Sequence, residues 1–423
     1  MFLCSCVNLY NMRVMLRTYG CAFNRADSDA VAKAVRSINA RVAIYNTCCV
    51  KDATEQKILC AISREKIPVV VTGCLAEAEP EKILRTKPNA SLVGISQQHR
   101  IAAAVKSAAK GKPVRWLGRG KRCLSAHADG LVGRVRICEG CLGACSFCET
   151  KIARGGLRSY GVREIMRAAE SCVKEGAREI QLCAQDDGAY GLDIGTSLPA
   201  LSAALNQIPG DFRVRIGMLN PEHAPKVIGA FSPSKVYKFL HIPVQSGSDA
   251  VLKAMQRPYS VADFHRAITS YRRKYPRITL ATDIIVGFPT ETEADFGKTM
   301  DLLRAVRFDV VNVSKYCARP HTAASKMLQL PNSVIKKRSE IASALCRKIS
   351  EEKNKEWAGW EGDVLFIEKG KDGTVVGRND SYKPVAVKGA RIGETKRVKI
   401  ISATRSCLLA VTARAGAAPR RNG

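Results

Sequence analysis

Acidic side chains and long apolar runs are scarce in this 423-residue sequence, and each scarcity argues against a class of protein. Acidic residues number 38 against 68 basic ones, which leaves a formal net charge of +30. This excess is too large for a typical soluble metabolic enzyme and favours a polyanionic partner, nucleic acid first and an anionic membrane surface second. A basic surface that is merely solvated remains the alternative, since charge alone defines no site. No run of 18 or more apolar residues is present, so we expect no transmembrane helix.

The opening segment lacks the charged start and long apolar stretch of a secretory signal, which predicts a reducing, cytoplasmic environment. Cysteine, in contrast, is abundant, with 17 residues. In a reducing compartment, clustered cysteines indicate metal binding or catalysis before they indicate disulfide bonds.

The first part of the chain, residues 1–110, alternates short apolar strands with helical stretches and predicts a small α/β domain. The next segment, residues 111–130, is rich in Gly, Lys and Arg and indicates a linker. Within the α/β domain we expect strands at 13–19, 42–46, 68–72 and 91–93, and helices at 27–38 and 52–64.

Residues 131–357 repeat the strand and helix pattern six times, which predicts parallel strands covered by helices. Because six units are too few for a closed eight-stranded barrel, we expect a partial (β/α)6 barrel with its chemistry at the carboxyl ends of the strands. One long helix over 331–357 ends this segment. The six strands are expected at 134–138, 179–183, 213–219, 237–243, 279–287 and 309–315.

The C-terminal part, residues 358–414, consists of short β runs separated by Gly-containing turns and predicts a small β-barrel or sandwich. The final residues, 415–423, are expected to be disordered. The β runs are expected at 363–368, 374–378, 383–387 and 395–403.

The strongest chemical signal is the segment CEGCLGACSFC, directly after the first expected barrel strand. Its cysteines Cys141, Cys145 and Cys148 have C-x3-C-x2-C spacing, whereas Cys138 lies on the strand and is interpreted as a non-ligand. Three thiolates can hold three irons of a 4Fe-4S cluster and leave the fourth iron open, the arrangement that binds and reductively cleaves S-adenosylmethionine. A zinc site is the alternative, although zinc normally takes four closed ligands. The spacing, with the aromatic Phe147 before the last cysteine, resembles the signature of the radical-SAM superfamily.

Three further cysteines, Cys21, Cys48 and Cys74, each follow an expected strand of the N-terminal domain, in TYGCAFNRADSD, NTCCV and VTGCLAE. Loops after parallel strands converge on one edge of a sheet, so these thiols can meet around one metal centre. Without further information, each would more often be a small buried apolar residue. The three segments resemble the N-terminal signatures of methylthiotransferases, and the resemblance implies an auxiliary 4Fe-4S cluster on these cysteines, with Cys49 in a variable position.

The resemblance continues in family order through the expected barrel, in RGGLRSYG, QLCAQDDGAYGLDIG, RIGMLNP, HIPVQSGSDAVLKAM and TDIIVGFPTETEADF. Polar or small residues follow the strands in these segments, and their positions make them candidates for contacts with S-adenosylmethionine or substrate. Helix capping and turn formation are the competing explanation for each. The candidates are Gln185, Asp186, Asp187, Gln245, Ser246 and Gly287, and Phe147 of the cysteine segment is a further candidate.

The C-terminal β segment resembles the TRAM module, which the family uses to bind RNA. Small β-barrels of this kind commonly bind RNA, and a lysine-rich surface without function is the alternative. The basic residues expected to face phosphates are Lys369, Lys371, Arg378, Lys383, Lys388, Arg391, Lys396 and Arg397.

The resemblance implies a reaction in which a 5′-deoxyadenosyl radical removes hydrogen from carbon 2 of an adenine and a methylthio group takes its place. The family acts on isopentenyl-adenosine of tRNA, threonylcarbamoyl-adenosine of tRNA, or an aspartate of a ribosomal protein. EGCLGACSFC with TKIARGGLRSY, and QDDGAYGLDIG, are most similar to the archaeal and eukaryotic threonylcarbamoyl group. The implied substrate is N6-threonylcarbamoyladenosine at position 37, in the anticodon loop of tRNA, and no side chain is assigned a direct catalytic role. A non-catalytic Fe-S protein that binds RNA is the alternative from another class.

Overall fold

The structure is a computed structural model that describes residues 6–7, 14–49, 52–118, 120, 124 and 126–412. The predicted disordered tail, 415–423, lies outside these residues. The described chain forms two compact units. The first comprises residues up to Phe212 with 255–257 and 317–329, and the second comprises 213–254, 258–316 and the residues from Leu330 onward. None of the helices in the described ranges combines the length and hydrophobicity needed to span a bilayer.

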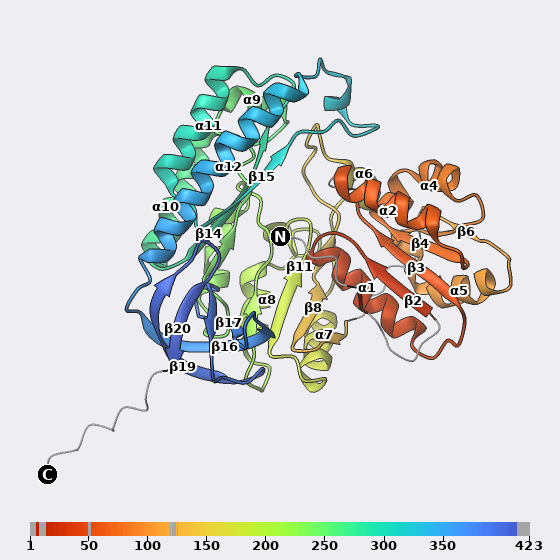
Figure 1. The fold of residues 1–423 in the computed structure, drawn as a ribbon, viewed down its shortest axis with the longest axis horizontal. Helices are drawn as coiled ribbons and strands as arrows, with labels where there is room; N and C mark the ends of the chain where they lie inside the picture. Colours follow the sequence, from red (N-terminus) through yellow and green to blue (C-terminus); the bar gives the residue numbers. More distant parts are fainter. Residues whose placement is uncertain are drawn as a thin grey trace, which may run out of the picture. The chain divides into compact units, whose positions relative to one another are not determined.

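The first unit begins with a six-stranded sheet in the order β1-β2-β3-β4-β5-β6 (Figure 1). β1 is antiparallel to β2, and every later pair of neighbours is parallel. The sheet confirms the predicted α/β domain, and β6 extends it into the segment that was expected to be a linker. The strands are β1 (Cys6–Val7), β2 (Val14–Thr18), β3 (Val42–Thr47), β4 (Val69–Gly73), β5 (Ser91–Val93) and β6 (Arg115–Trp116).

Helices cover both faces of this sheet, because the side chains of its central strands alternate between two cores. Ile44 of β3 belongs to a core with Val31 and Val105, while the next residue, Tyr45, belongs to a second core with Ile58. All six residues of β3 are therefore buried. The helices are α1 (Ala22–Val35), α2 (Asp52–Arg64), α3 (Cys74–Ala78), α4 (Pro80–Thr86), η1 (Ile95–Arg100) and α5 (Ile101–Ala109).

The first unit also contains the first strands of the expected barrel. β8 and β11 are parallel, and α7 packs on β8. A Cβ atom on Gly133 of β8 would lie 2.6 Å from the Cβ of Cys172 in α7, so this cysteine packs directly on the strand backbone. The elements are β7 (Ala128–Asp129), β8 (Val132–Arg136), β9 (Cys138–Glu139), α6 (Glu149–Arg154), β10 (Arg158–Ser159), α7 (Val162–Lys174), β11 (Glu179–Cys183), η2 (Asp187–Ala189), α8 (Leu198–Asn206) and η4 (Ala323–Lys326).

The second unit contains a parallel sheet in the order β13-β14-β15. Leu240 and its register partner Leu280 are fully buried, whereas His241 and Asp283, on the opposite face, are partly exposed. The third and fourth predicted strands are shorter than expected. The elements are β12 (Arg213–Arg215), η3 (Ala224–Phe231), β13 (Phe239–His241), α9 (Asp249–Ala254), α10 (Val261–Lys274), β14 (Thr279–Val286), α11 (Glu293–Val306), β15 (Val310–Lys315) and α12 (Asn332–Lys355).

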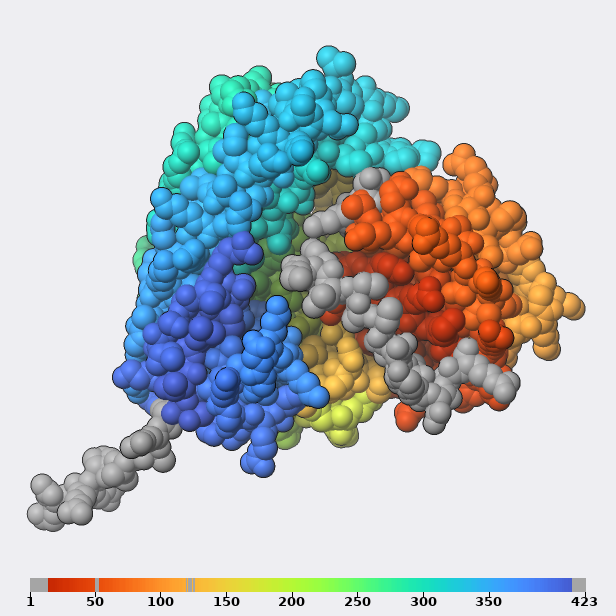
Figure 2. All heavy atoms as spheres, in the orientation of Figure 1, coloured from red at the N-terminus to blue at the C-terminus, as the bar shows by residue number. Residues whose placement is uncertain are grey.

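A closed barrel in the order β16-β17-β18-β20-β19 follows α12 in the second unit. Its core contains Val364, Phe366, Val398 and Leu408, and Trp357, two residues after the end of α12, belongs to the same core. Figure 2 shows α12 and the barrel, in the blue shades, as one continuous surface, and α12 contacts β19. Four strands were predicted; the fifth, β20, closes the barrel by pairing with both β18 and β19. The strands are β16 (Glu361–Lys369), β17 (Val375–Arg378), β18 (Pro384–Val387), β19 (Thr395–Ala403) and β20 (Leu408–Thr412).

Candidate functional site

Cys141, Cys145 and Cys148 lie on the loop that joins β9 to α6, and all three thiols are free of disulfide bonds. The backbone N–H of Gly143 donates to the Cys141 sulfur at 3.3 Å, and the Cys148 N–H donates to the Cys145 carbonyl at 3.1 Å. A Cβ atom on Gly143 would lie 3.5 Å and 3.7 Å from the sulfurs of Cys141 and Cys145, so the glycine leaves space beside them. The donor set fits a three-cysteine 4Fe-4S cluster.

The ionisation of these thiols depends on what binds beside them. Burial, followed by the neighbouring Cys145 thiol, raises the pKa of Cys148 to about 11. A thiol of this kind becomes a thiolate at neutral pH only when a cation offsets its charge. Arg257 adds a hydrogen-bond donor to the same loop, with its Nη1 3.0 Å from the sulfur of Cys145.

Cys138, interpreted as a non-ligand, is fully buried on β9, and its sulfur lies 3.7 Å from the Asp186 carbonyl oxygen. The side chain of Asp186 caps η2 by accepting the Gly188 N–H at 3.0 Å, so capping, the competing explanation, describes its observed contact. Oε1 of Gln185 accepts the N–H of Gly140 at 2.7 Å, next to Cys141. Phe147 is half-buried within the cysteine loop.

The second set of cysteines lies at the carboxyl ends of three neighbouring parallel strands. Cys21 is the N-cap of α1 and closely follows β2, Cys48 directly follows β3, and Cys74 follows β4 and begins α3. Because β2, β3 and β4 are adjacent and parallel, the three loops share one edge of the sheet. The expected convergence of these loops is therefore observed.

Asn24 and Gly20 hold two of these loops together. The Asn24 amide donates to the carbonyl oxygens of Tyr19 at 2.6 Å and Thr47 at 2.8 Å, which lie beside Cys21 and Cys48 in the chain. Gly20 has φ +114°, and a Cβ atom there would lie 2.9 Å from the Cys48 sulfur. Only glycine fits both this backbone conformation and this contact.

Cys49, placed in a variable position by the sequence, has a specific contact. Its thiol is fully buried and hydrogen-bonds to Cys74. That hydrogen bond, together with the charge of Arg154, lowers the pKa of Cys74 to about 6. Four thiols therefore gather at this edge of the sheet, and the doubled cysteine in NTCCV is the sequence signal for the fourth.

In neither set of three cysteines do the sulfur atoms lie as close together as the ligands of a single metal ion. Among the described residues, the one group of three possible ligand side chains with atoms within 4.8 Å of one another is Glu55, Glu79 and Glu149. Arg319 lies 2.7 Å from Glu55, and Lys82 pairs with Glu55 and Glu79. Burial, followed by a hydrogen bond with Glu79, raises the pKa of Glu149 to about 8. Two cations and one retained proton balance the three acids, so we assign no metal to them.

The remaining candidate residues lie in the second unit. Gln245 has φ +69°, and its N–H donates to the Asp283 carbonyl at 2.9 Å. Ser246 is fully buried and accepts the Ser248 N–H at 3.2 Å, a local turn contact. Gly287 has φ +77°, and a Cβ atom there would lie 2.5 Å from Cγ1 of Ile335 in α12. Packing against α12 thus requires a glycine at this position, and contact with a ligand stays a prediction.

This packing explanation predicts the effect of a substitution. Gly287→Ala should destabilise the protein by about 2 kcal/mol or more, since a left-handed backbone alone costs about 1–2 kcal/mol and the Cβ contact adds to it. Ile335→Ala removes the two closest of these contacts, with Cγ1 and Cγ2, and keeps the one with Cβ at 3.0 Å. Ile335→Ala should therefore cost less stability in the Gly287→Ala background than in the wild-type chain. Urea unfolding of the four proteins measures this coupling. Strict additivity would show that Ile335 does not impose the glycine.

Sequence reasoning missed a polar group on the open face of the β13-β14-β15 sheet. Nε2 of His241 lies 3.1 Å from Asp283, and the Asn312 amide donates to the same carboxylate at 2.6 Å. The three residues come from successive strands. His241 and Asp283 lie inside the motifs HIPVQSG and TDIIVGFPT. The sequence therefore contained both residues but did not show that their side chains face each other.

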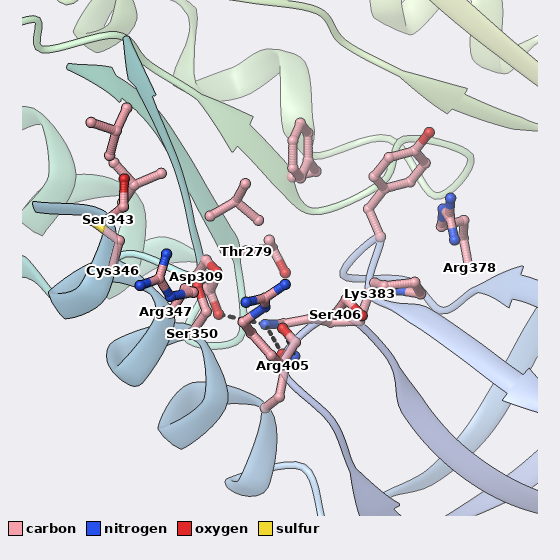
Figure 3. Close-up of a pocket in the computed structure, with 17 residues that line it drawn as sticks. Thr279, Asp309, Ser343, Cys346, Arg347, Ser350, Arg378, Lys383, Arg405 and Ser406 are labelled. Carbon is pink, nitrogen blue, oxygen red and sulfur yellow. Dashed lines mark hydrogen bonds and ion pairs between the residues drawn. The ribbon is translucent and has the colours of Figure 1, made fainter. Parts of the chain in front are cut away.

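A cavity of 490 Å³ lies in the second unit, bordered by α12, by the start of the β13-β14-β15 sheet and by the barrel (Figure 3). Figure 3 shows Arg347 on the α12 side and Arg378 on the opposite side. Lys383, expected to face RNA phosphates, is buried and pairs with Asp309 at 2.7 Å, so that prediction was wrong. Exposed basic residues remain on the barrel at Lys369, Lys371, Lys388, Arg391 and Arg397.

Three family models match this chain. They are the radical SAM superfamily over residues 135–303, the uncharacterized protein family UPF0004 over 13–94, and the TRAM domain over 358–412. The solved structure of TsrM, a radical S-adenosylmethionine methyltransferase from Kitasatospora setae, has a TM-score of 0.50 at 13% identity, covering 72% of this chain and 67% of that one. This likeness supports the radical-SAM fold. Membership of the superfamily implies S-adenosylmethionine and one 4Fe-4S cluster.

Relatives that match most of this chain identify the family within the superfamily. A probable threonylcarbamoyladenosine tRNA methylthiotransferase of Archaeoglobus fulgidus is 40% identical over 92% of this chain and 96% of its own length. The Homo sapiens threonylcarbamoyladenosine tRNA methylthiotransferase is 36% identical over 89% of this chain and 69% of its own length. The chain belongs to the threonylcarbamoyladenosine tRNA methylthiotransferase family of radical-SAM proteins.

Proposed function

We propose that this chain transfers a methylthio group to carbon 2 of N6-threonylcarbamoyladenosine at position 37 of tRNA, next to the anticodon. The observation that carries this proposal is the match of nearly the whole chain to relatives named for that substrate. The product is 2-methylthio-N6-threonylcarbamoyladenosine. We also propose a cytoplasmic location, because cysteines without disulfide bonds are expected in a reducing compartment.

The cluster loop of the first unit would hold the radical-generating cofactors. A 4Fe-4S cluster with one open iron, together with S-adenosylmethionine, supplies a radical strong enough to act on an unactivated aromatic C–H. Cys141, Cys145 and Cys148 would provide the three thiolates. Arg257 donates to Cys145, and Gln185 fixes the backbone beside Cys141.

The edge of the N-terminal sheet would hold a second 4Fe-4S cluster on Cys21, Cys48 and Cys74. The observed convergence of their loops and the packing of Gly20 against Cys48 support this ligand set. Cys49 lies beside Cys74 and is available as a further thiol. We propose Phe147, Gln185, Gln245 and Gly287 as contacts for S-adenosylmethionine or substrate.

The C-terminal barrel and the adjoining cavity would bind the anticodon arm of the tRNA. Exposed lysines and arginines of the barrel can neutralise phosphates, which supplies much of the affinity of RNA-binding proteins. Arg347 and Arg405 extend this basic surface around the cavity. A base in an anticodon loop leaves its stack at a cost of a few kcal/mol, less than in a duplex.

The test is anaerobic reconstitution with iron and sulfide, followed by incubation with S-adenosylmethionine, a reductant and tRNA that carries threonylcarbamoyl-adenosine. Mass spectrometry of the digested nucleosides should show the gain of one methylthio group on that nucleoside. An unchanged nucleoside with accumulation of 5′-deoxyadenosine would retain the radical chemistry and overturn the substrate. The same incubation with tRNA that carries isopentenyl-adenosine then distinguishes the alternative.

Reversing the charge beside the cavity should weaken tRNA binding. We expect Arg347→Glu/Arg405→Glu to raise the Kd and to reduce the slope of log Kd against log salt by about 1 for each phosphate that is no longer neutralised. Filter binding at several salt concentrations measures both. Arg266→Glu/Arg304→Glu, on the exposed surfaces of α10 and α11, is the control matched for net charge. Equal effects of this control and of Arg347→Glu/Arg405→Glu would remove the cavity from the proposed surface.

A further inference from the structure

Arg154 brings a buried positive charge to the second set of cysteines. Its side chain is 2% exposed, and its Nε lies 3.4 Å from the Cys74 sulfur. Its Nη2 donates to Asp27 at 2.5 Å, and the guanidinium stacks on the Phe23 ring at 4.1 Å. Asp27 and Phe23 belong to α1, which begins next to Cys21. The guanidinium is therefore held in one orientation by a carboxylate, a ring and a sulfur.

The position of Arg154 in the chain connects the two cysteine sets. It is the last residue of α6, which begins directly after Cys148, and Cys74 is the first residue of α3. α3 and α6 pack directly against each other within the first unit. The segment that carries the radical-SAM cysteines thus supplies a hydrogen-bond donor to a cysteine of the other set.

Hydrogen bonds and positive charge at a cysteine sulfur stabilise the more negative, reduced state of an iron-sulfur cluster. An arginine does this with a rigid, permanently charged group, whereas a lysine offers a flexible point charge. Arg257 makes the equivalent contact with Cys145 of the other set. Each proposed cluster site therefore has an arginine that donates to one of its sulfurs.

We propose that Arg154 is a positioning residue for the second cluster, fixing the Cys74 side chain and raising the reduction potential of the cluster through its contact with the sulfur. This inference rests on the proposed function, because it takes Cys21, Cys48 and Cys74 as ligands. It concerns a residue that the sequence motifs left without a role.

Arg136 provides a matched control. It is also buried, and its Nη1 donates to the other oxygen of Asp27 at 3.0 Å and pairs with Glu139 at 3.4 Å. Replacing Arg136 removes one buried positive charge and one ion pair with Asp27, and replacing Arg154 removes the same two features. The two ion pairs given for Arg136 are both with carboxylates. Arg154, in contrast, pairs with Asp27 and also donates to the Cys74 sulfur. Comparing the two replacements therefore tests the contact with the sulfur against the loss of a buried charge.

The experiment uses the full chain with Cys141, Cys145 and Cys148 replaced by alanine, so that one cluster site remains. Iron content, the EPR spectrum of the reduced cluster and its midpoint potential are measured for this parent and for versions carrying Arg154→Gln, Arg154→Lys or Arg136→Gln. We expect Arg154→Gln to lower the midpoint potential and alter the EPR spectrum. Arg154→Lys should lie between it and the parent, and Arg136→Gln should shift the potential less.

The outcomes separate the inference from the proposed function. If the parent binds no cluster, the ligand set of the proposed function is wrong. If the parent binds a cluster and Arg154→Gln leaves its potential and spectrum unchanged, or shifts them no more than Arg136→Gln, the inference is overturned. If Arg154→Gln does not fold, Arg154→Lys decides by the same comparison with the parent and Arg136→Gln.

Discussion

Replacing Cys141, Cys145 and Cys148 together with alanine is expected to abolish cleavage of S-adenosylmethionine, whereas replacing Cys21, Cys48 and Cys74 should preserve cleavage and abolish methylthiolation. The reason is that the two sets occupy different loops, one between β9 and α6 and the other at the edge of the N-terminal sheet. Each loop is supported by its own hydrogen bonds. Formation of 5′-deoxyadenosine and of the methylthiolated nucleoside, measured in the same reaction, checks both results.

Buried cysteines outside both sets supply the controls for this experiment. Cys172 of α7 and Cys346 of α12 are buried, and their replacement with alanine should leave both products unchanged apart from a small loss of stability. Cys49→Ala tests the fourth thiol at the sheet edge. Loss of cleavage in both triple variants, with normal folding, would contradict the separation of the two sites.

The positions of Cys21, Cys48 and Cys74 in the fold could be predicted from the sequence because each follows a strand with a clear pattern. β3 and β4 are continuous buried runs with a cysteine directly after each, and parallel neighbours place such positions at one edge. The C-x3-C-x2-C segment is local in sequence and predicted the cluster loop in the same way. In both cases the information lies within a few consecutive residues.

The contacts that orient these cysteines could not be predicted, because they join residues far apart in the chain. Arg154 lies 80 residues from Cys74, and Arg257 lies 112 residues from Cys145. The strand β20 could not be predicted for the same reason, because it is short and is defined by its pairing with β18 and β19. Lys383 resembled the other basic residues of the barrel in sequence, and its partner Asp309, 74 residues away, is evident only in the fold.

Lys383→Met is expected to destabilise the second unit by about 3 to 5 kcal/mol, because it leaves a buried carboxylate without its cation. The side chains of Lys383 and Asp309 are 4% and 5% exposed, and Lys383 also donates to Asn354 at 2.8 Å. Asp309 accepts the backbone N–H of Leu280 at 2.9 Å, so the pair connects the barrel to the start of β14. Urea unfolding followed by the fluorescence of Trp357 and Trp360, in a Trp116→Phe background, reports on this unit.

The double variant Lys383→Met/Asp309→Asn decides whether the loss comes from the unpaired charge. Asparagine is neutral and its oxygen can still accept the Leu280 N–H, so we expect the double variant to recover much of the stability lost in Lys383→Met. Lys371→Met, at an exposed position of the same barrel, should change the unfolding free energy by less than about 0.5 kcal/mol. A double variant no more stable than Lys383→Met would show that packing of the lysine stem, and not its charge, connects the barrel to the sheet. With the ion pair intact, we expect the barrel and the β13-β14-β15 sheet to unfold together, because Lys383 and Asp309 join them. The same pair would then hold the proposed RNA-binding surface in one arrangement around the cavity.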